Sequence, residues 1–206
     1  KVISYISLAQ NLVSLSQMLS RLNIKRGDLV GILLPNSSDF VVSYFAILNL
    51  EAVVIPLNNF LKPEELEIIL EDSNFRFIVT NSSFTKTIDY LKKDKNVLTD
   101  CLFIDRDISG EFKFFRKPLK NFGLNQLKSS ATKKDLAVIL YTSGTTGQPK
   151  GAMLSHGNLL FDVTMCVEAI EAAKNDNFIC MLPLFHSFPS TVCMLLPLSV
   201  GATTTI

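Results

Sequence analysis

The N-terminal part of the chain alternates between helical patterns and short apolar runs, and this alternation restricts it to few folds. Leucines recur at spacings of four and three over residues 8–22, which predicts one face of a helix ending near Asn23. The apolar run 28–34 is stopped by turn residues at 35–38. It therefore predicts a buried strand, followed by a turn whose Ser or Asp caps a second amphipathic helix.

The same alternation continues to residue 80. An apolar run at 52–57 predicts a second strand, and a further strand is predicted at 75–80. Between them, Pro63 and Glu64 predict the first turn of a helix, because proline suits that turn and acids suit its positive end. Short connections between strands and helices are typical of a parallel sheet covered on both faces. We therefore expect an α/β fold with mostly parallel strands flanked by helices.

Two later segments have weaker patterns. Residues 91–134 read as a variable connector with one strand near 101–104. Residues 177–206 carry no formal charge, but prolines and a glycine interrupt them. A buried strand, helix and strand is therefore favoured over a membrane span, and we expect no transmembrane segment. The connector also holds three phenylalanines that we expect to anchor the core, Phe112, Phe114 and Phe115.

Composition narrows the class of partner. The chain has 206 residues, of which 48% are hydrophobic, and a net charge of +1. This suffices for a core and provides no basic stripe of the kind that a nucleic-acid backbone requires. The four cysteines lack metal-ligand spacing, and we expect reduced packing residues of a cytoplasmic protein, with peripheral membrane association left open. A small-molecule substrate fits better than nucleic acid.

The strongest signal for function is a loop that directly follows an apolar strand. Residues 136–141 predict that strand, and residues 142–151 contain four hydroxyl side chains, three glycines and Lys150. Glycines let backbone N–H groups converge on phosphate oxygens, and the hydroxyls and lysine add donors. A surface turn is the less favoured alternative. With Pro149 and Gly151 at two of its motif positions the loop is not a Walker A sequence, and it is not GxGxxG either, so kinase-type and Rossmann interpretations lose their main support.

The segment 141–158 reads YTSGTTGQPKG followed by AMLSHGN. It resembles the phosphate-loop signature of the adenylate-forming superfamily, which comprises acyl-CoA synthetases, aryl-CoA ligases, luciferases and adenylation domains of peptide synthetases. Blocks at 25–30, 34–37 and 52–58 resemble upstream segments of that family in order and spacing. The resemblance therefore spans nearly the whole chain and is closest to the acyl-CoA synthetase type.

The resemblance implies a partial N-terminal domain of the adenylate-forming fold over residues 1–206. A first α/β subdomain with the connector would cover about 1–134, and the start of a second subdomain about 135–206. The adenine-binding segment, the ribose-binding Asp, the hinge and the C-terminal domain would lie beyond Ile206. We therefore expect a fragment that does not turn over alone. The alternative is a complete nucleotide-binding module without catalysis.

The resemblance also implies a two-step reaction. A carboxylate and ATP would form an acyl adenylate, and the thiol of CoA would then take the acyl group. ATP and Mg²⁺ would bind at the loop, whereas CoA would not be held by these residues alone. A ligase that loads an acyl carrier protein shares the same residues and stays open. The implied phosphate-binding residues are Thr142, Ser143, Gly144, Thr145, Thr146, Gly147 and Lys150, with Thr145 and Thr146 near the metal and Thr145 and Lys150 catalytic.

A second block, LPLFHSF at 182–188, places His186 after an apolar strand. A lone histidine beside phenylalanines is more often a packing residue. In acyl-CoA and aryl-CoA ligases, however, the matching LPLFH block lies beside the acyl pocket and the ATP site. The resemblance implies that His186 faces the carboxylate or adenylate as a catalytic and substrate-binding residue, with Phe185 and Phe188 as pocket walls. It favours a fatty or aromatic acid, and the apolar segment 191–198 would back such a pocket.

Two further positions carry structural expectations. Glu51 stands where the resembling sequences usually have Gly, so a positive φ there would cost stability locally. His156 receives a structural role, because it follows Ser155, a candidate helix cap. The apolar face of that helix is predicted to consist of Leu159, Leu160, Val163 and Val167.

Overall fold

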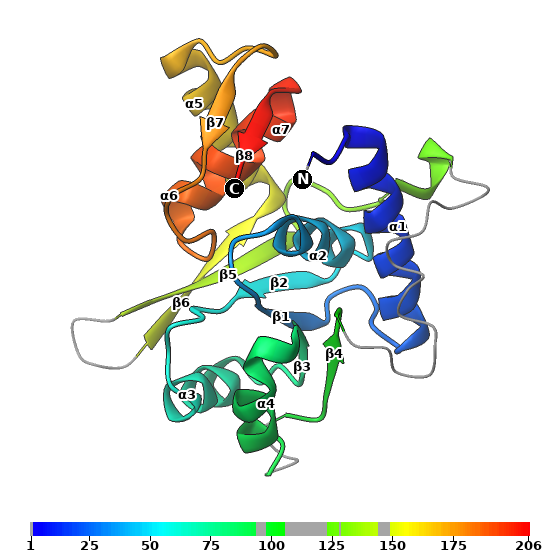
Figure 1. Cartoon of the computed structure of the whole chain (residues 1–206), viewed down its shortest axis with the longest axis vertical. Coiled ribbons are helices and arrows are strands. Elements are labelled where there is room, and N and C mark those ends of the chain that lie inside the picture. Colours follow the sequence, from blue (N-terminus) through cyan, green and yellow to red (C-terminus); the bar gives the residue numbers. More distant parts are fainter. Residues whose placement is uncertain (1, 94–97, 106–122, 128, 144–148) are drawn as a thin grey trace.

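The computed structural model describes residues 2–93, 98–105, 123–127, 129–143 and 149–206. Its centre is a six-stranded sheet with the strand order β4-β3-β1-β2-β5-β6 (Figure 1). Neighbouring strands from β4 to β5 are parallel, and only β6 pairs antiparallel with its neighbour. The strands are β1 (Leu29–Leu33), β2 (Val53–Pro56), β3 (Phe77–Thr80), β4 (Asp100–Phe103), β5 (Leu136–Ser143) and β6 (Pro149–Ser155).

Helices cover both faces of this sheet, which confirms the predicted α/β class. On one face lie α1 (Tyr5–Arg21) and α2 (Ser38–Asn49), and on the other α3 (Pro63–Ser73) and α4 (Thr85–Leu91) (Figure 1). Alternate residues of each strand serve the two cores: Val30 and Ile32 of β1 pack toward α1 and α2, and Leu33 toward α3 and α4. Short 3₁₀ turns occur at Ser82–Phe84 and Leu124–Leu127.

Helix ends follow the sequence signals. The Ser37 side chain caps α2 by accepting a hydrogen bond from the Phe40 N–H, and Pro63 occupies the first turn of α3. Ser155 caps α5 (His156–Ile170) through the N–H of Asn158. These caps satisfy backbone donors that the first helical turn leaves free, and each confirms a prediction.

A smaller layer follows β6 at one end of the sheet (Figure 1). It contains α5 and a parallel pair, β7 (Asn177–Ile179) and β8 (Thr203–Thr205). A helical stretch joins the pair and consists of α6 (Ser187–Ser190), a π-helical turn (Thr191–Leu195) and α7 (Leu196–Val200). The predicted order of strand, helix and strand is confirmed. Among the described helices, none is long and apolar enough to cross a membrane.

Burial in this smaller layer differs from the prediction. Asn177 and Ile179 of β7 are exposed, so this strand is not buried, although it carries no charge. On α5 only Val163 is buried, and Leu160 of the predicted apolar face is 54% exposed. The predicted burial is therefore wrong for β7, whereas it is confirmed for Leu184, Met194 and Leu196 in the turn and helical stretch that follow.

The predictions for the cysteines, for the strand in the connector and for its phenylalanines have different outcomes. None of the four cysteines, all of which are among the described residues, forms a disulfide; Cys180 and Cys193 are buried, whereas Cys101 and Cys166 are half-buried. The predicted strand near residues 101–104 is β4. The expected phenylalanine anchors at 112, 114 and 115 lie outside the described residues.

Candidate functional site

The predicted phosphate loop joins β5 to β6, and the two strands form an antiparallel hairpin. Thr142 pairs with Lys150 and Ser143 with Pro149 at the loop end of this hairpin. Thr142 and Lys150 are both exposed. Residues directly opposite each other in such a ladder project from the same face, with Cβ atoms about 5 Å apart. The hairpin therefore brings one predicted hydroxyl donor beside the predicted lysine; Gly144, Thr145, Thr146 and Gly147 lie outside the described residues.

A tyrosine and a glycine form the base of this hairpin. Tyr141 lies opposite Gly151, where an added Cβ would come within 2.8 Å of Ile139 Cγ2 and 3.1 Å of Tyr141 Cζ. The Tyr141 hydroxyl donates to Asp72 Oδ2 of α3 at 2.5 Å. Burial, reinforced by the bond to Asp72, raises the pKa of Tyr141 to about 12, so the phenol stays protonated and remains a donor. These contacts attach the hairpin to α3 just before the predicted loop.

Replacing Gly151 by alanine is expected to destabilise the hairpin by about 1–3 kcal/mol, because the new methyl group overpacks against Tyr141 and Ile139. Urea unfolding of the wild type and the variant measures the difference. Ala152→Ser is the matched control, since Ala152 is the next residue along and is exposed. Equal unfolding midpoints for the Gly151 variant and the wild type would contradict this packing argument.

His186 lies in a tight turn between β7 and α6. Its N–H donates to the Pro183 carbonyl at 3.1 Å, and its own carbonyl accepts from the Ser190 N–H at 3.1 Å. The residue is exposed and occupies the N-cap position of α6. The buried Phe185 ring lies 4.3 Å from the imidazole, centroid to centroid. The backbone of this turn thus presents the imidazole at the surface.

Two phenylalanines flank this turn in different ways. Phe60, which follows β2, makes an edge contact with Phe185 at a centroid distance of 6.1 Å and is 76% exposed. Phe188 is 64% exposed. Among the described residues, Phe60 is thus an aromatic neighbour of the His186 turn that the sequence did not single out.

The helix after His186 contains a π-helical turn. The Leu196 N–H bonds to the Thr191 carbonyl, five residues earlier. Pro197 follows directly, and proline in a regular helix loses a hydrogen bond and clashes with the preceding turn. The wider turn accommodates it, and such turns occur frequently at functional sites.

Two cavities lie near these elements in the described part of the chain. The larger, about 680 Å³, lies between the start of α1, the β1–α2 turn and the segment from Cys193 to Ile206. The smaller, about 230 Å³, is lined by Tyr44 and by residues of β5, α5 and α6. Cys193, Met194 and Leu198 of the predicted apolar backing line the larger cavity. Neither cavity includes Phe185, His186 or Phe188, so their predicted pocket roles remain predictions.

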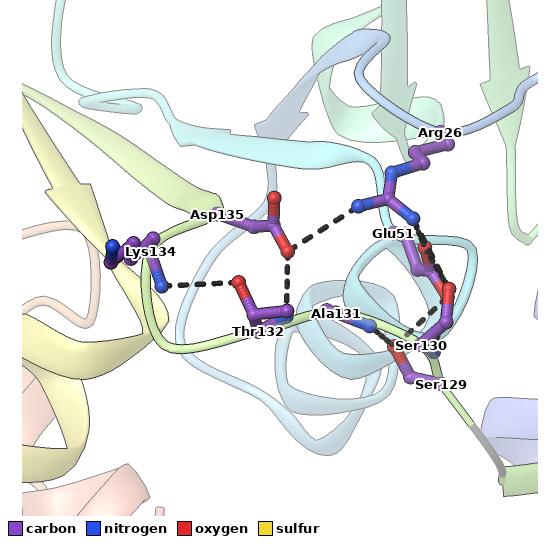
Figure 2. A network of polar contacts seen from close by, with 8 residues as sticks. All are labelled: Arg26, Glu51, Ser129, Ser130, Ala131, Thr132, Lys134 and Asp135. Atoms are coloured by element: carbon purple, nitrogen blue, oxygen red, sulfur yellow. Dashed lines mark hydrogen bonds and ion pairs between the residues drawn. The ribbon is translucent and has the colours of Figure 1, made fainter.

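A polar cluster holds the segment that leads into β5 (Figure 2). We call it the Arg26 clasp, and it consists of Arg26, Glu51, Ser129, Ser130 and Asp135. Glu51 accepts hydrogen bonds from the Ser130 N–H at 2.5 Å and from the hydroxyls of Ser129 and Ser130. Arg26 forms ion pairs with Glu51 at 2.8 Å and with Asp135 at 3.3 Å. Because Asp135 directly precedes β5, the clasp ties the start of that strand to the turns before β1 and β2.

The clasp also shows why Glu51 is tolerated. Its φ is +59°, so the condition stated for this position is met: the backbone lies in the left-handed region, which is unfavourable for a residue with a Cβ atom. Backbone and side-chain hydrogen bonds from Ser130, aided by Arg26, hold the pKa of the Glu51 carboxyl below its usual value. Hydrogen bonds from Thr132 and the charge of Arg26 lower the pKa of Asp135 likewise. Carboxylates with lowered pKa values stabilise the fold above their unfolded pKa, and this stabilisation is lost as pH falls below about 4.

Two replacements of Glu51 separate strain from the clasp. Glu51→Ala loses the clasp and still carries a Cβ atom on a left-handed backbone. Glu51→Gly loses the clasp and relieves the backbone strain. We expect the alanine variant to melt about 2–8 °C below the glycine variant in a unit of this size. Thermal unfolding at pH 7 and pH 3 measures this, and both variants should lose less stability on acidification than wild type. Equal melting temperatures for the two variants would refute the strain argument.

The chain is similar in sequence and in structure to known proteins. The model of the family "AMP-binding enzyme" matches residues 1–206. The chain is 30% identical to 4-coumarate–CoA ligase 4 of Arabidopsis thaliana, covering 98% of this chain and 37% of that protein. A long-chain-fatty-acid-CoA ligase from Archaeoglobus fulgidus has a similar structure, with a TM-score of 0.86 and 26% identity over 98% of this chain and 39% of that one. ATP-bound MatB from Rhodopseudomonas palustris gives a TM-score of 0.81 and 27% identity, over 97% and 39%.

The matched relatives are much longer than this chain. The chain spans 37% of the coumarate ligase and 39% of each of the two solved structures. The likeness extends through both layers of the fold, since it covers at least 97% of this chain in each case.

Proposed function

Because the chain belongs to the AMP-binding enzyme family, we propose that it supplies the ATP-phosphate site of an acid–CoA ligase. In the first step a carboxylate oxygen attacks the α-phosphorus of ATP, and the bond to pyrophosphate breaks. In the second step a thiol attacks the acyl carbon and AMP leaves. The observation that carries the proposal is the β5–β6 hairpin, which pairs Thr142 with Lys150 at the ends of the signature loop.

Charge development in the first step explains the composition of the loop. Negative charge accumulates on the departing pyrophosphate, and donors aimed at that charge lower the barrier. The Lys150 ammonium group, the Thr142 hydroxyl and the backbone N–H groups of the loop are suited to this task. The attacking carboxylate is already ionised near neutral pH, so no general base is required. We propose phosphate contacts for Thr142, Ser143, Gly144, Thr145, Thr146, Gly147 and Lys150.

Mg²⁺ neutralises phosphate charge when it is bound in such enzymes. Among the described residues there is no group of three His, Cys, Asp or Glu side chains that could hold a metal ion. The hydroxyls of Thr145 and Thr146 remain the proposed ligands, in addition to the phosphates of ATP.

We propose that the carboxylate substrate binds at the turn that carries His186. The exposed imidazole next to the buried Phe185 ring provides a polar group at an apolar edge, which suits a carboxylate attached to an apolar body. Phe188 is proposed as a second wall. A matched relative is named for coumarate and a matched structure for long-chain fatty acids. We favour a fatty acid because of the apolar segment after His186.

The division of the chain near residue 134 is proposed to separate a first α/β subdomain from the start of a second one. The hairpin that carries the phosphate loop then belongs to the second subdomain in sequence, although β5 pairs with β2 in the main sheet.

The full-length protein should convert a carboxylic acid, ATP and CoA to an acyl-CoA thioester, AMP and pyrophosphate. Mass spectrometry of reactions with fatty, aromatic and dicarboxylic acids measures the product. A holo carrier-protein domain, which bears the phosphopantetheine thiol, serves as the alternative acceptor. If the thioester forms only on the carrier, the carrier and not CoA is the acceptor. If no acid gives an acyl adenylate, the proposal is refuted.

A further inference from the structure

The side chain of Asn36 bridges the turn after β1 to the segment that carries His186. Its Nδ2 donates to the Leu182 carbonyl at 2.8 Å, and its Oδ1 accepts from the Leu184 N–H at 2.8 Å. Nδ2 also lies 3.5 Å from the Cys180 Sγ. One amide therefore uses both its donor and its acceptor on backbone groups that flank Pro183, on a segment about 150 residues away in sequence.

These two hydrogen bonds hold the backbone to which His186 is hydrogen-bonded. Pro183, between the two clamped residues, provides the carbonyl that accepts the His186 N–H at 3.1 Å. Leu184 is fully buried, and Phe185 is buried next to the imidazole at 4.3 Å. The Asn36 amide thus fixes the start of the tight turn that ends at His186. The backbone on either side of Asn36 is constrained, because Pro35 precedes it and Ser37 caps α2 immediately after it.

The position of Asn36 at the carboxyl end of β1 is relevant to function. In open α/β sheets, ligands bind outside the carboxyl ends of the parallel strands. Phe60, which follows the neighbouring strand β2, meets Phe185 at the same edge. The clamp therefore brings the His186 turn to the edge of the sheet where a ligand is expected.

We propose that Asn36 is a positioning residue that sets the place of His186 through the backbone of residues 182–184. The proposal rests on the proposed role of His186 toward the carboxylate. Only a side chain with a donor and an acceptor on one planar group makes both bonds. Aspartate has the same shape, but places a second carboxylate oxygen against the Leu182 carbonyl, so Asn36→Asp removes one bond and adds repulsion. Asn36→Leu removes both bonds.

Hydrogen exchange of the full-length protein tests the clamp without reference to activity. Peptides that cover residues 182–188 should exchange about tenfold faster in the Asn36→Leu variant, and faster than wild type in Asn36→Asp, while β1 peptides stay unchanged. Asn49→Asp is the matched control: its Nδ2 also donates two bonds, to Ser16 and Gln126, away from the His186 turn. Unchanged exchange over 182–188 in both Asn36 variants overturns the proposal.

A kinetic cycle tests positioning against a merely structural role. Asn36→Asp should lower kcat/KM for the carboxylate about tenfold and leave the KM for ATP within about twofold. In a His186→Ala background the same change should cost less than about twofold, because the group it positions is already gone. Multiplicative losses would overturn the positioning role. If the wild type shows no carboxylate-dependent turnover, the proposed function fails and the role in catalysis fails with it, whereas the exchange result still decides whether the clamp exists.

Discussion

Replacing Lys150 by alanine in the full-length enzyme should slow carboxylate-dependent exchange of pyrophosphate into ATP by about 100-fold. The structure places Lys150 opposite Thr142 at the loop end of the β5–β6 hairpin, where both side chains are exposed. A charge at that point stabilises the departing pyrophosphate more than it stabilises bound ATP. The loss should therefore fall mainly on the exchange rate at saturating ATP. Thr145→Ala should act in the same direction.

Removal of a surface charge elsewhere provides the control. Lys86→Ala removes one exposed ammonium group from α4, on the other side of the main sheet from α1 and α2. Its exchange rate should equal that of wild type. A Lys150 variant that exchanges pyrophosphate at the wild-type rate would remove the hairpin from the chemistry.

Replacing His186 by alanine is expected to have the second-largest effect. The kcat/KM for the carboxylate should fall at least tenfold, or the preference among acids should change, because a lost contact with a charged group costs about 1.5–3 kcal/mol. Affinity for ATP should stay nearly unchanged, since the proposed phosphate contacts lie on the β5–β6 hairpin. Steady-state kinetics with each substrate varied in turn separates the two effects.

The other histidine is a matched control for this change. The His156 N–H donates to the Asp135 carbonyl at 3.0 Å, at the start of α5, and its proposed role is structural. His156→Ala keeps that backbone bond and should leave carboxylate kinetics unchanged. A His186 variant that loses ATP binding selectively would contradict the assignment of His186 to the carboxylate.

The main sheet could be predicted because its signals are local. Strands such as β1 are buried on both faces and therefore appear as continuous apolar runs. Caps such as Ser37 and Ser155 stand within a few residues of the helices they begin. At Glu51 the sequence raises a positive φ only as a condition, and the backbone there has a φ of +59°.

The sequence did not predict β6 or the exposure of β7. Most residues of β6 are exposed, so no apolar run marks the strand, although it pairs antiparallel with β5. For β7, absence of charge predicts burial, but Asn177 and Ile179 are exposed, and exposed apolar side chains such as Met181 follow the strand. Apolar composition alone does not reveal what covers a segment.

Long-range polar contacts were not predictable either. The Ser130 N–H reaches Glu51 across 79 residues, and the Leu184 N–H reaches Asn36 across 148. Asn36 stands in a sequence block that resembles the family, but the block does not indicate which distant backbone groups form hydrogen bonds with Asn36. Such partners follow from the arrangement of turns at the ends of neighbouring strands, which is a property of the folded sheet.

Pyrophosphate exchange in the absence of any thiol tests the central claim most directly. The full-length protein is incubated with ATP, labelled pyrophosphate and a panel of carboxylic acids, without CoA or carrier protein. We predict that label enters ATP only when an accepted acid is present, because the acyl adenylate forms and reverts. Label incorporation that is independent of every acid, or no incorporation with any of them, would contradict it.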